Sequence, residues 1–552
     1  MDSKTVTAIA LAMLVLVGWN VWYYYRYKDV MERNRLERLE QKQQEAAGTP
    51  QETGKKPPAT EQLQIEAKPP APLETVPLSP FESEPAEQAK VTGDDLITVN
   101  TGVTEVTLSK VGGVIHSLKL TKFAKPDGEP VELVNQGAKY GPLAVGFATR
   151  EATAKINSAR FATSSPSRIT LTDTEPDRTV TFGFKLESGF ELVKKVTFHR
   201  NSYRIDLETV VTQPGGGASA SSYGLSWPGM GDGMDSKYSY EGPVTMVDGK
   251  RLTEKPDEGE KQSYEGQVKW AGLTSKYYCV AFFPESETSK VTNTLIGEKK
   301  YSATLEMVAA GNRSVNRVAI YAGPKIRGEL GKMGSDFKNI INYGWFDIIA
   351  KPLFILMLWF YGVIGNWGWS IIIVTILIKV LFFPLSQKSY KSMKKMQKLQ
   401  PQMKILQERY KNDKEKLNQE LMATYKKHNV NPLGGCLPMF LQIPVFIGLY
   451  RVLLQSIELK GAPFIFWLTD LSAKDPYYVT PILMGLSMLA QQKLSPSSAD
   501  PIQKNMMLLM PVVFTVMFLN FPSGLVVYWL TSNILSILQQ YYINRSHRYE
   551  VA

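Results

Sequence analysis

The sequence predicts a multi-pass α-helical membrane protein with six transmembrane helices, five of which form a core, and a large antiparallel β-sandwich domain outside the membrane. Three observations support this fold class. Apolar runs occur near the N-terminus and again after residue 360, a strongly basic block lies between two of the later runs, and the region before residue 324 alternates apolar with polar residues. At 552 residues, the chain is also too long for a single compact domain.

The first predicted element is an N-terminal transmembrane anchor, 1–28. Its span, 6–25, carries no charge and ends in Trp and Tyr residues, which are enriched at membrane interfaces. About twenty apolar residues are enough to cross roughly 30 Å of hydrocarbon as a helix. No A-x-A cleavage site follows the run, so an uncleaved anchor is favoured over a signal peptide.

A charged segment and a Pro-rich disordered tether are predicted at 29–92. Pro, Glu, Gln and Lys dominate 46–92, and aromatic residues are scarce there. Such a composition cannot bury enough apolar surface to offset the entropy lost on ordering the chain. We therefore expect this stretch to connect the anchor to the next domain without a fold of its own.

Residues 93–323 are predicted to form the β-sandwich. Around 180–186 and 203–208, apolar residues alternate with polar ones, which is typical of half-buried strands. Gly and Pro turns recur at short intervals and no clear amphipathic helix is present. Two packed antiparallel sheets are therefore expected.

The same region offers little for catalysis. His116 and His199 are its only histidines, Cys279 lies in an apolar strand, and neither a GxSxG nor an HExxH motif occurs. We interpret both histidines as core or surface residues and expect no catalytic residue. A sugar-processing envelope enzyme stays open as an alternative, to be tested by assaying the soluble domain for carbohydrate turnover.

A linker with an interfacial amphipathic helix is predicted at 324–364. Its apolar stretch, 345–362, is interrupted by Asp347, Lys351 and Pro352, which favours a helix that lies in the membrane interface over one that crosses it. A five-helix core is predicted to follow at 365–544. Its spans are expected at 366–384, 436–455, 477–492, 506–520 and 524–543.

The basic block at 387–427 sets the predicted orientation. It holds twelve Lys or Arg against four acidic residues, a net charge of +8 out of +11 for the whole chain. Because cytoplasmic loops are enriched in Lys and Arg, the block is predicted to be cytoplasmic. The sides of the loops then alternate, which places both termini and the short tail, 545–552, in the cytoplasm and residues 28–345 across the membrane.

Two antiparallel helices are predicted within a cytoplasmic hairpin, 385–430. Apolar residues recur at threes and fours on either side of a turn at 411–413, and Pro401 is expected to kink the first helix. The hairpin is either a solvated projection or a binding surface for a ribosome, anionic phospholipid or an adaptable protein client. Its apolar flanks argue against a specific nucleic-acid site. The candidate contact residues are Lys394, Lys395, Lys398 and Arg409.

Five motifs together resemble the YidC/Oxa/Alb family of membrane protein insertases. They are GNWGWSIII (365–373), the run 430–438 with Gln442 and Pro444, DLSAKDPYY (470–478), PILMG (481–485) and FPSGLVVYW (521–529). The anchor, tether and β-domain resemble the Gram-negative form of the family. The resemblance implies a periplasmic β-supersandwich, a five-helix core in the bacterial inner (cytoplasmic) membrane, and insertion of small inner membrane proteins alone or beside the Sec translocon.

The resemblance also implies a client-binding groove. The family carries an arginine in a hydrophilic groove of its second span, and the matching residue here is Lys379. A charge inside an apolar span costs roughly 2.5 to 3.5 kcal/mol on insertion scales, which favours a functional role over snorkelling of the lysine stem to nearby water. Thr375, one turn earlier, and Gln442, in the next span, would extend a polar stripe. Tyr528 or Trp529 of the last span is expected near the groove.

These features predict an ATP-independent insertase and folding chaperone, not an enzyme. No Walker motif occurs, and Cys279 and Cys436 are far apart without CxxC spacing, so neither a cofactor nor a metal is expected. The expected partners are nascent inner membrane protein clients, the Sec translocon, the ribosome and anionic phospholipid. A transporter or channel, the competing class, would need polar residues through the full membrane depth, whereas Lys379 lies towards one side.

Overall fold

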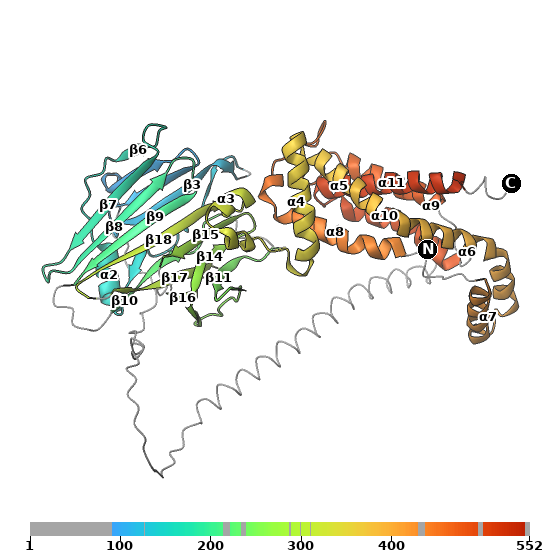
Figure 1. Cartoon of the computed structure of the whole chain (residues 1–552), viewed down its shortest axis with the longest axis horizontal. Helices are drawn as coiled ribbons and strands as arrows, with labels where there is room; N and C mark the ends of the chain where they lie inside the picture. The colour runs from blue at the N-terminus through green and yellow to red at the C-terminus, as the bar shows by residue number, and fades with distance from the viewer. Residues whose placement is uncertain are drawn as a thin grey trace, which may run out of the picture. The chain divides into compact units, whose positions relative to one another are not determined.

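The computed structural model describes most of the chain after residue 90 (Figure 1). The described residues are 91–125, 127–213, 221–232, 239–285, 289–297, 300–309, 311–428, 437–494 and 501–546. The predicted anchor, nearly all of the predicted tether and most of the predicted tail lie outside them, as does most of the 430–438 motif. The domain boundaries given above stay predictions.

The described part of the β-rich region contains eighteen strands. They are β1 (Leu96–Asn100), β2 (Thr104–Ser109), β3 (Val114–Ala124), β4 (Pro130–Glu132), β5 (Ala144–Gly146), β6 (Arg168–Thr170), β7 (Asp177–Lys185), β8 (Glu191–His199), β9 (Arg204–Thr212), β10 (Ser221–Pro228), β11 (Gly242–Val247), β12 (Lys250–Leu252), β13 (Lys261–Gly266), β14 (Val268–Thr274), β15 (Tyr278–Pro284), β16 (Ser289–Gly297), β17 (Lys300–Ala309) and β18 (Arg313–Pro324). The short 3-10 helix η1 (Gly93–Asp95) precedes β1.

The strands form three sheets. Their orders are β4-β3-β2-β1-β6, β13-β16-β17-β10-β5 and β12-β11-β14-β15-β18-β9-β8-β7, and the long strands of the third run side by side in Figure 1. Strands β11, β14 and β18 of this sheet pack against β17 of the second sheet. The predicted alternation is confirmed in β7, where Val180 and Phe182 are buried and Thr181 is exposed.

Two details of the predicted β-domain are wrong. Strands β1 and β6 pair in parallel, so the sheets are not wholly antiparallel. A nine-residue helix, α2 (Arg150–Ser158), also lies in this region. Polar contacts hold it in place: the Thr149 hydroxyl accepts from the Ala152 N–H, and the Asn157 amide bonds both the N–H and the carbonyl of Val145. The buried face of α2 combines Thr153 and Asn157 with Ile156, so the apolar periodicity by which a helix is identified in a sequence is incomplete here.

One lysine is fully buried inside the β-domain. The Nζ of Lys194 donates to the carbonyl oxygens of Gly112 at 2.8 Å, Gly113 at 3.2 Å and Leu143 at 2.8 Å. Burial lowers the pKa of this amine to about 7, because removal from water disfavours the charged form. The amine thus ties the turn between β2 and β3 to the segment that precedes β5.

Short helices connect the β-domain to the helical region. They are α3 (Arg327–Lys332), η2 (Ser335–Ile340) and η3 (Gly344–Phe346). Phe337 of η2 is buried against three aromatic rings of the β-domain, with ring centroids 5.3 Å from Trp270, 4.8 Å from Phe283 and 5.4 Å from Tyr321. The start of the connection therefore belongs to the packing of the β-domain.

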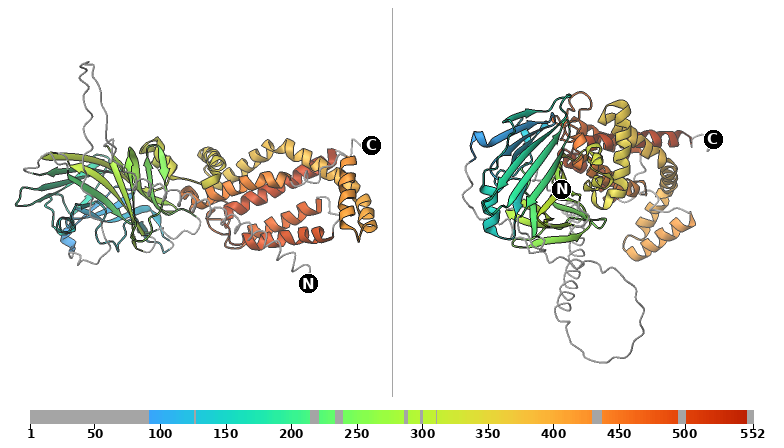
Figure 2. Two further views of the ribbon diagram at one scale, coloured as in Figure 1. Left: turned by 90° about the horizontal axis from the view of Figure 1, so that it is seen from below. Right: turned by 60° about the vertical axis from the view of Figure 1, so that its left-hand side comes forward.

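The helical region contains eight longer helices in its described part. They are α4 (Asp347–Ile364), α5 (Trp367–Leu381), α6 (Phe383–Arg409), α7 (Lys414–Lys427), α8 (Leu437–Gln455), α9 (Val479–Leu494), α10 (Pro501–Phe518) and α11 (Ser523–Ser546), with the 3-10 turn η5 (Ile457–Leu459) after α8. Helix α11 packs against α5 and α9, α4 packs against α5 and α8, and α9 packs against α10. The pair α6 and α7 projects from one end of this bundle (Figures 1 and 2).

Within the described residues, one helix, 344–364, is long and apolar enough to cross a membrane by itself. Helices α5 and α6 meet the same criteria as a pair, but they are bent by 63° at their junction. Ile348, Trp359 and Val363 on the exposed face of α4 are as apolar as the residues on its packed face. Its placement at the interface stays a prediction.

Candidate functional site

The GNWG motif positions α5. Gly365 ends α4 in the left-handed conformation (φ +71°) that favours glycine, and the side chain of Asn366 caps α5 by accepting from the Trp369 N–H at 3.1 Å. The Asn366 amide also donates to the Phe464 carbonyl at 3.1 Å. A Cβ on Gly368 would lie 1.9 Å from the Phe464 ring, so glycine is required for this loop to dock on α5.

A buried carboxylate positions α9 and its preceding loop. Asp475 is 1% exposed and accepts from the N–H and hydroxyl of Thr480 at 2.8 and 2.7 Å, and from the Trp467 indole at 3.1 Å. Burial alone would raise its pKa, but the bonds from Thr480, Tyr477 and Trp467 outweigh burial and hold the pKa below its ordinary value. The DLSAKDPYY motif thus supplies the start of a core helix.

Lys379 lies in the last turn of α5 and contacts α11. Its Nζ donates to the Ser536 hydroxyl at 2.8 Å, and Ser536 in turn donates to the Ser532 carbonyl at 2.8 Å. Among the described residues, no carboxylate forms an ion pair with this amine. Two of its three N–H donors are therefore left for water or for a bound group.

Sequence reasoning missed the polar stripe that α11 contributes. Ser532, Asn533, Ser536 and Gln540 are all buried, and the Asn533 amide donates to the Ser487 hydroxyl of α9 at 2.9 Å. Polar residues at a spacing of four inside an otherwise apolar run were the signal, because such residues share one face of a helix. A polar seam therefore joins α5, α9 and α11 around the lysine.

The other predicted groove residues take separate positions. Thr375 is buried one turn before Lys379, and its hydroxyl donates to the carbonyl of residue 371 in its own helix. Gln442 of α8 donates to the hydroxyl of Tyr528, which lies eight residues before Ser536 on the same face of α11. At about 1.5 Å per residue, roughly 12 Å of helix separates these two contacts.

Trp529 does not join this polar set. Its ring packs among Phe446, Phe514 and Phe518, with centroids 4.9, 5.6 and 5.1 Å away. Neighbouring positions on a helix point about 100° apart, so Tyr528 and Trp529 face different neighbours. Of the two aromatic candidates, Tyr528 therefore contacts a second predicted groove residue.

The hairpin pairs a small apolar cluster with a basic surface. Leu399 and Met403 of α6 are buried against Met396, Leu421 and Tyr425. The predicted turn is confirmed, since Asp413 caps α7 by accepting from the Lys416 N–H at 3.0 Å. Part of the Met-rich stripe is therefore the core of the hairpin itself.

The four candidate basic residues of the hairpin differ in exposure. Lys395, Lys398 and Arg409 are exposed. Lys394 is half-buried and donates to the carbonyl of Ile543 in α11 at 3.4 Å. Desolvation, followed by the charge of Lys398, lowers the pKa of Lys394. Three of the four side chains are thus accessible to a partner, and the fourth braces α6 against α11.

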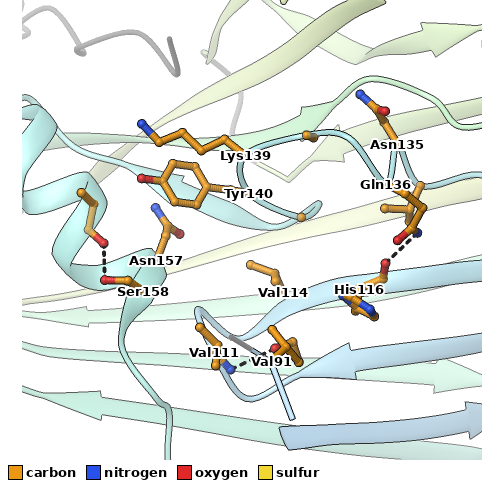
Figure 3. Close-up of a pocket in the computed structure, with 15 residues that line it drawn as sticks. Val91, Val111, Val114, His116, Asn135, Gln136, Lys139, Tyr140, Asn157 and Ser158 are labelled. Atoms are coloured by element: carbon orange, nitrogen blue, oxygen red, sulfur yellow. Dashed lines mark hydrogen bonds between the residues drawn. The ribbon is translucent and has the colours of Figure 1, made fainter. Parts of the chain in front are cut away.

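The β-domain contains a pocket beside β3 and α2 (Figure 3). Val111 and Val114 form part of its wall, and His116, Gln136 and Tyr140 lie around it. Among its described lining residues none is Asp or Glu, so the pair of carboxylates used by most glycoside hydrolases is not found there.

His199 and Cys279 of the β-domain lie in environments that suit a structural role better than a catalytic one. Both ring nitrogens of His199 lie 2.7 Å from carboxylates, those of Asp177 and Asp206. Cys279 is fully buried, and burial raises the pKa of its thiol to about 12, which disfavours the nucleophilic thiolate. In the described part of the chain, no group of three or more His, Cys, Asp or Glu is placed to hold a metal ion.

Comparisons with known proteins agree with the motifs. A family described as "YidC periplasmic domain" matches residues 96–356, and one described as "60Kd inner membrane protein" matches 359–550. The chain is similar to proteins named membrane protein insertase YidC from Geobacter sp. (strain M21), 41% identical over 465 residues (82% of this chain and 85% of the relative), and from Syntrophus aciditrophicus (strain SB), 41% identical over 468 residues (81% and 85%).

A crystal structure of an active YidC insertase with its first transmembrane domain resolved is 17% identical, with a TM-score of 0.38, and covers 84% of this chain and 95% of that one. The identity of about two fifths with the curated relatives extends over both the β-domain and the helical region. The chain therefore belongs to the YidC family of membrane protein insertases.

Proposed function

We propose that this protein inserts and helps to fold bacterial inner membrane proteins through a hydrophilic groove, without ATP. The observation that carries the proposal is the half-buried amine of Lys379, which faces the polar seam of α11 and has a single hydrogen-bond partner among the described side chains, Ser536. A cation in a low-dielectric site attracts a carboxylate more strongly than it would in water. Lys379 would therefore attract the acidic residues of a client's translocated segment.

The driving force would come from the client. The polar seam, formed by residues such as Ser532 and Asn533, would hold water and lower the cost of bringing a short polar segment into the membrane. The client's own apolar helix would then leave the groove for lipid, which is favourable by burial of apolar surface. Thr375, Gln442 and Tyr528 would extend the polar path, and Trp529 would form its apolar border.

The proposed topology has six spans, counting the predicted anchor at 6–25 and five core spans, with α4 in the interface. Both termini and the hairpin would lie in the cytoplasm and the β-domain in the periplasm, since the charge of 387–427 favours the cytoplasmic side. The exposed Lys395, Lys398 and Arg409 would then face the ribosome, anionic phospholipid or the client. Within the membrane, the proposed partner of the core spans is the Sec translocon.

A reconstitution tests this proposal. The purified full chain is placed in nucleotide-free proteoliposomes with two matched single-span clients, one with Asp and Glu in its translocated segment and one with Asn and Gln instead. Insertion, read as protection from external protease, should occur without ATP and should depend on the protein more strongly for the acidic client. Insertion that requires added nucleotide, or that is equal in protein-free vesicles, would contradict the proposal.

A further inference from the structure

A tight turn precedes α9 and carries an unusual aromatic residue. The Phe464 N–H donates to the Leu468 carbonyl at 2.8 Å, and the Leu468 N–H donates to the Ile465 carbonyl at 3.1 Å, which closes the turn. Residues 462–469 contain no charged side chain. We call 464–468 the aromatic turn.

The aromatic turn is fixed on both sides. On one side Phe464 sits over Gly368 and its carbonyl accepts from Asn366, at the first turn of α5. On the other side the Trp467 indole donates to the buried carboxylate of Asp475 at 3.1 Å. The position of the turn is therefore set by two core helices, α5 and α9.

Phe466, at the tip, points away from these contacts. It is 86% exposed, and its φ of +51° lies in the left-handed region, which bulky residues rarely adopt because of the cost of strain. Its ring stacks on Trp467 with centroids 5.9 Å apart. A turn that is held on both sides and carries backbone strain thus presents a large apolar side chain outward.

The location of the turn indicates what covers Phe466. Helix α5 starts at the turn and the basic hairpin begins after its other end, so the 15 residues of α5 separate the two, a rise of about 22 Å. Other exposed aromatic residues, Trp369 and Tyr477, lie at the same end of the bundle, on α5 and just before α9. Trp and Tyr concentrate where helix ends meet the boundary between headgroups and hydrocarbon.

We propose that the aromatic turn inserts Phe466 into this boundary in the outer leaflet and fixes the depth of α5 in the bilayer. The inference rests on the proposed orientation, in which the hairpin is cytoplasmic. With its outer end held at that boundary, α5 covers about 22 Å of a roughly 30 Å hydrocarbon core.

A depth measurement tests the proposal in the full chain. An environment-sensitive fluorophore is attached to Phe466→Cys in a background of Cys279→Ala and Cys436→Ser, and the protein is reconstituted in phosphatidylethanolamine and phosphatidylglycerol vesicles. Lipids spin-labelled near the headgroup should quench this site severalfold more than aqueous iodide does. A label at Val315→Cys, an exposed position on β18, is the control and should be quenched by iodide alone.

Two results would overturn the proposal. Quenching of position 466 by iodide as strong as at position 315 would place the tip in water, and quenching by neither agent would place it under protein. Client insertion is measured in the same vesicles, so normal insertion with a water-exposed tip would refute this inference and leave the proposed function standing. As a second readout, Phe466→Trp should insert clients normally, whereas Phe466→Asp should slow insertion severalfold; equal rates for both would also count against the proposal.

Discussion

Lys379 of α5 and Ser536 of α11 form a 2.8 Å hydrogen bond although 157 positions separate them in the chain. The serine hydroxyl gives its own proton to the Ser532 carbonyl, so it can only accept from the lysine. A serine that orients a cation in this way fixes the direction in which the remaining N–H donors point.

The positive charge of Lys379, and not the shape of its side chain, should be what client insertion requires. Lys379→Arg keeps the cation and should preserve insertion, whereas Lys379→Ala should slow insertion of the acidic client about tenfold, equivalent to a barrier change of ~1.4 kcal/mol. Insertion rates in proteoliposomes measure this, and thermal unfolding of each variant controls for loss of stability. If a stable Lys379→Ala variant inserts the acidic client at the original rate, the lysine only extends its amine to nearby water, and attraction of client carboxylates by Lys379 is refuted.

Removal of the β-domain should leave insertion largely intact, provided that the cut respects the packing of η2. Because Phe337 is buried against Trp270 and Phe283, a junction at residue 324 would expose it, whereas joining the anchor to residue 344 would not. The shorter protein should insert clients within about twofold of the full chain, a barrier change of ~0.4 kcal/mol. Complete loss of insertion by this protein, at normal expression, would assign the β-domain an essential role.

Gly368→Ala should weaken docking of the aromatic turn. A Cβ there would lie 1.9 Å from the Phe464 ring, and overpacking of this kind costs about 1–3 kcal/mol. A lower unfolding temperature in detergent, followed by intrinsic fluorescence, is the expected result. Gly362→Ala is the matched control, because no heavy atom lies within 4 Å of its added Cβ and helical alanine is more stable than glycine by up to ~1 kcal/mol. Equal unfolding temperatures for both variants would show that the Phe464 contact is dispensable.

Lys194 should make the stability of the β-domain depend on pH. Its pKa is about 7 in the folded domain and near 10.5 when unfolded, so below about pH 7 both states hold the proton and this lysine adds no slope. Above that pH the unfolded state binds more protons, so the free energy of unfolding should rise by up to ~1.4 kcal/mol per pH unit, until about pH 10. Urea unfolding of residues 91–343 between pH 6.5 and 9.5 measures the slope.

Two variants separate this lysine from its neighbours. Lys194→Met should flatten the rise with pH, because it removes the buried amine. Lys195→Met alters the adjacent residue, which is exposed and paired with Glu208 at 2.8 Å, and should keep the rise. A slope in Lys194→Met equal to that of the unsubstituted domain would assign the pH dependence to another group.

Much of the architecture could be predicted from sequence because it depends on local periodicity. Alternation around Val180 predicted β7, and long apolar runs predicted α8 and α11 to within a few residues. Helix α10 instead begins at Pro501, earlier than the expected residue 506. Apolar runs mark the part of a helix in hydrocarbon, and a helix can continue through polar residues such as Lys504 beyond it.

The site could be predicted only in part. Lys379 was identifiable as a charge inside an apolar run, but its partner Ser536 was not, because pairing between distant helices depends on how each is rotated about its axis. The same reason applies to Gln442 and Tyr528, whose contact follows from the packing of α8 on α11. The positive φ of Phe466 could not be predicted from the sequence either, because it is imposed by neighbouring contacts and not by the conformational preference of phenylalanine.

Because α5 and α6 meet at a bend of 63°, a rotation of α6 about this junction would move the hairpin as a lever arm. Helix α6 has 27 residues, so it is about 40 Å long at ~1.5 Å per residue. A rotation of roughly 10° about the junction at Phe382 would carry the far end of such a rod by about 7 Å, while displacing Lys379, less than one turn away, by little. A force applied at the hairpin tip would thus produce a smaller displacement at the groove, but a larger force there.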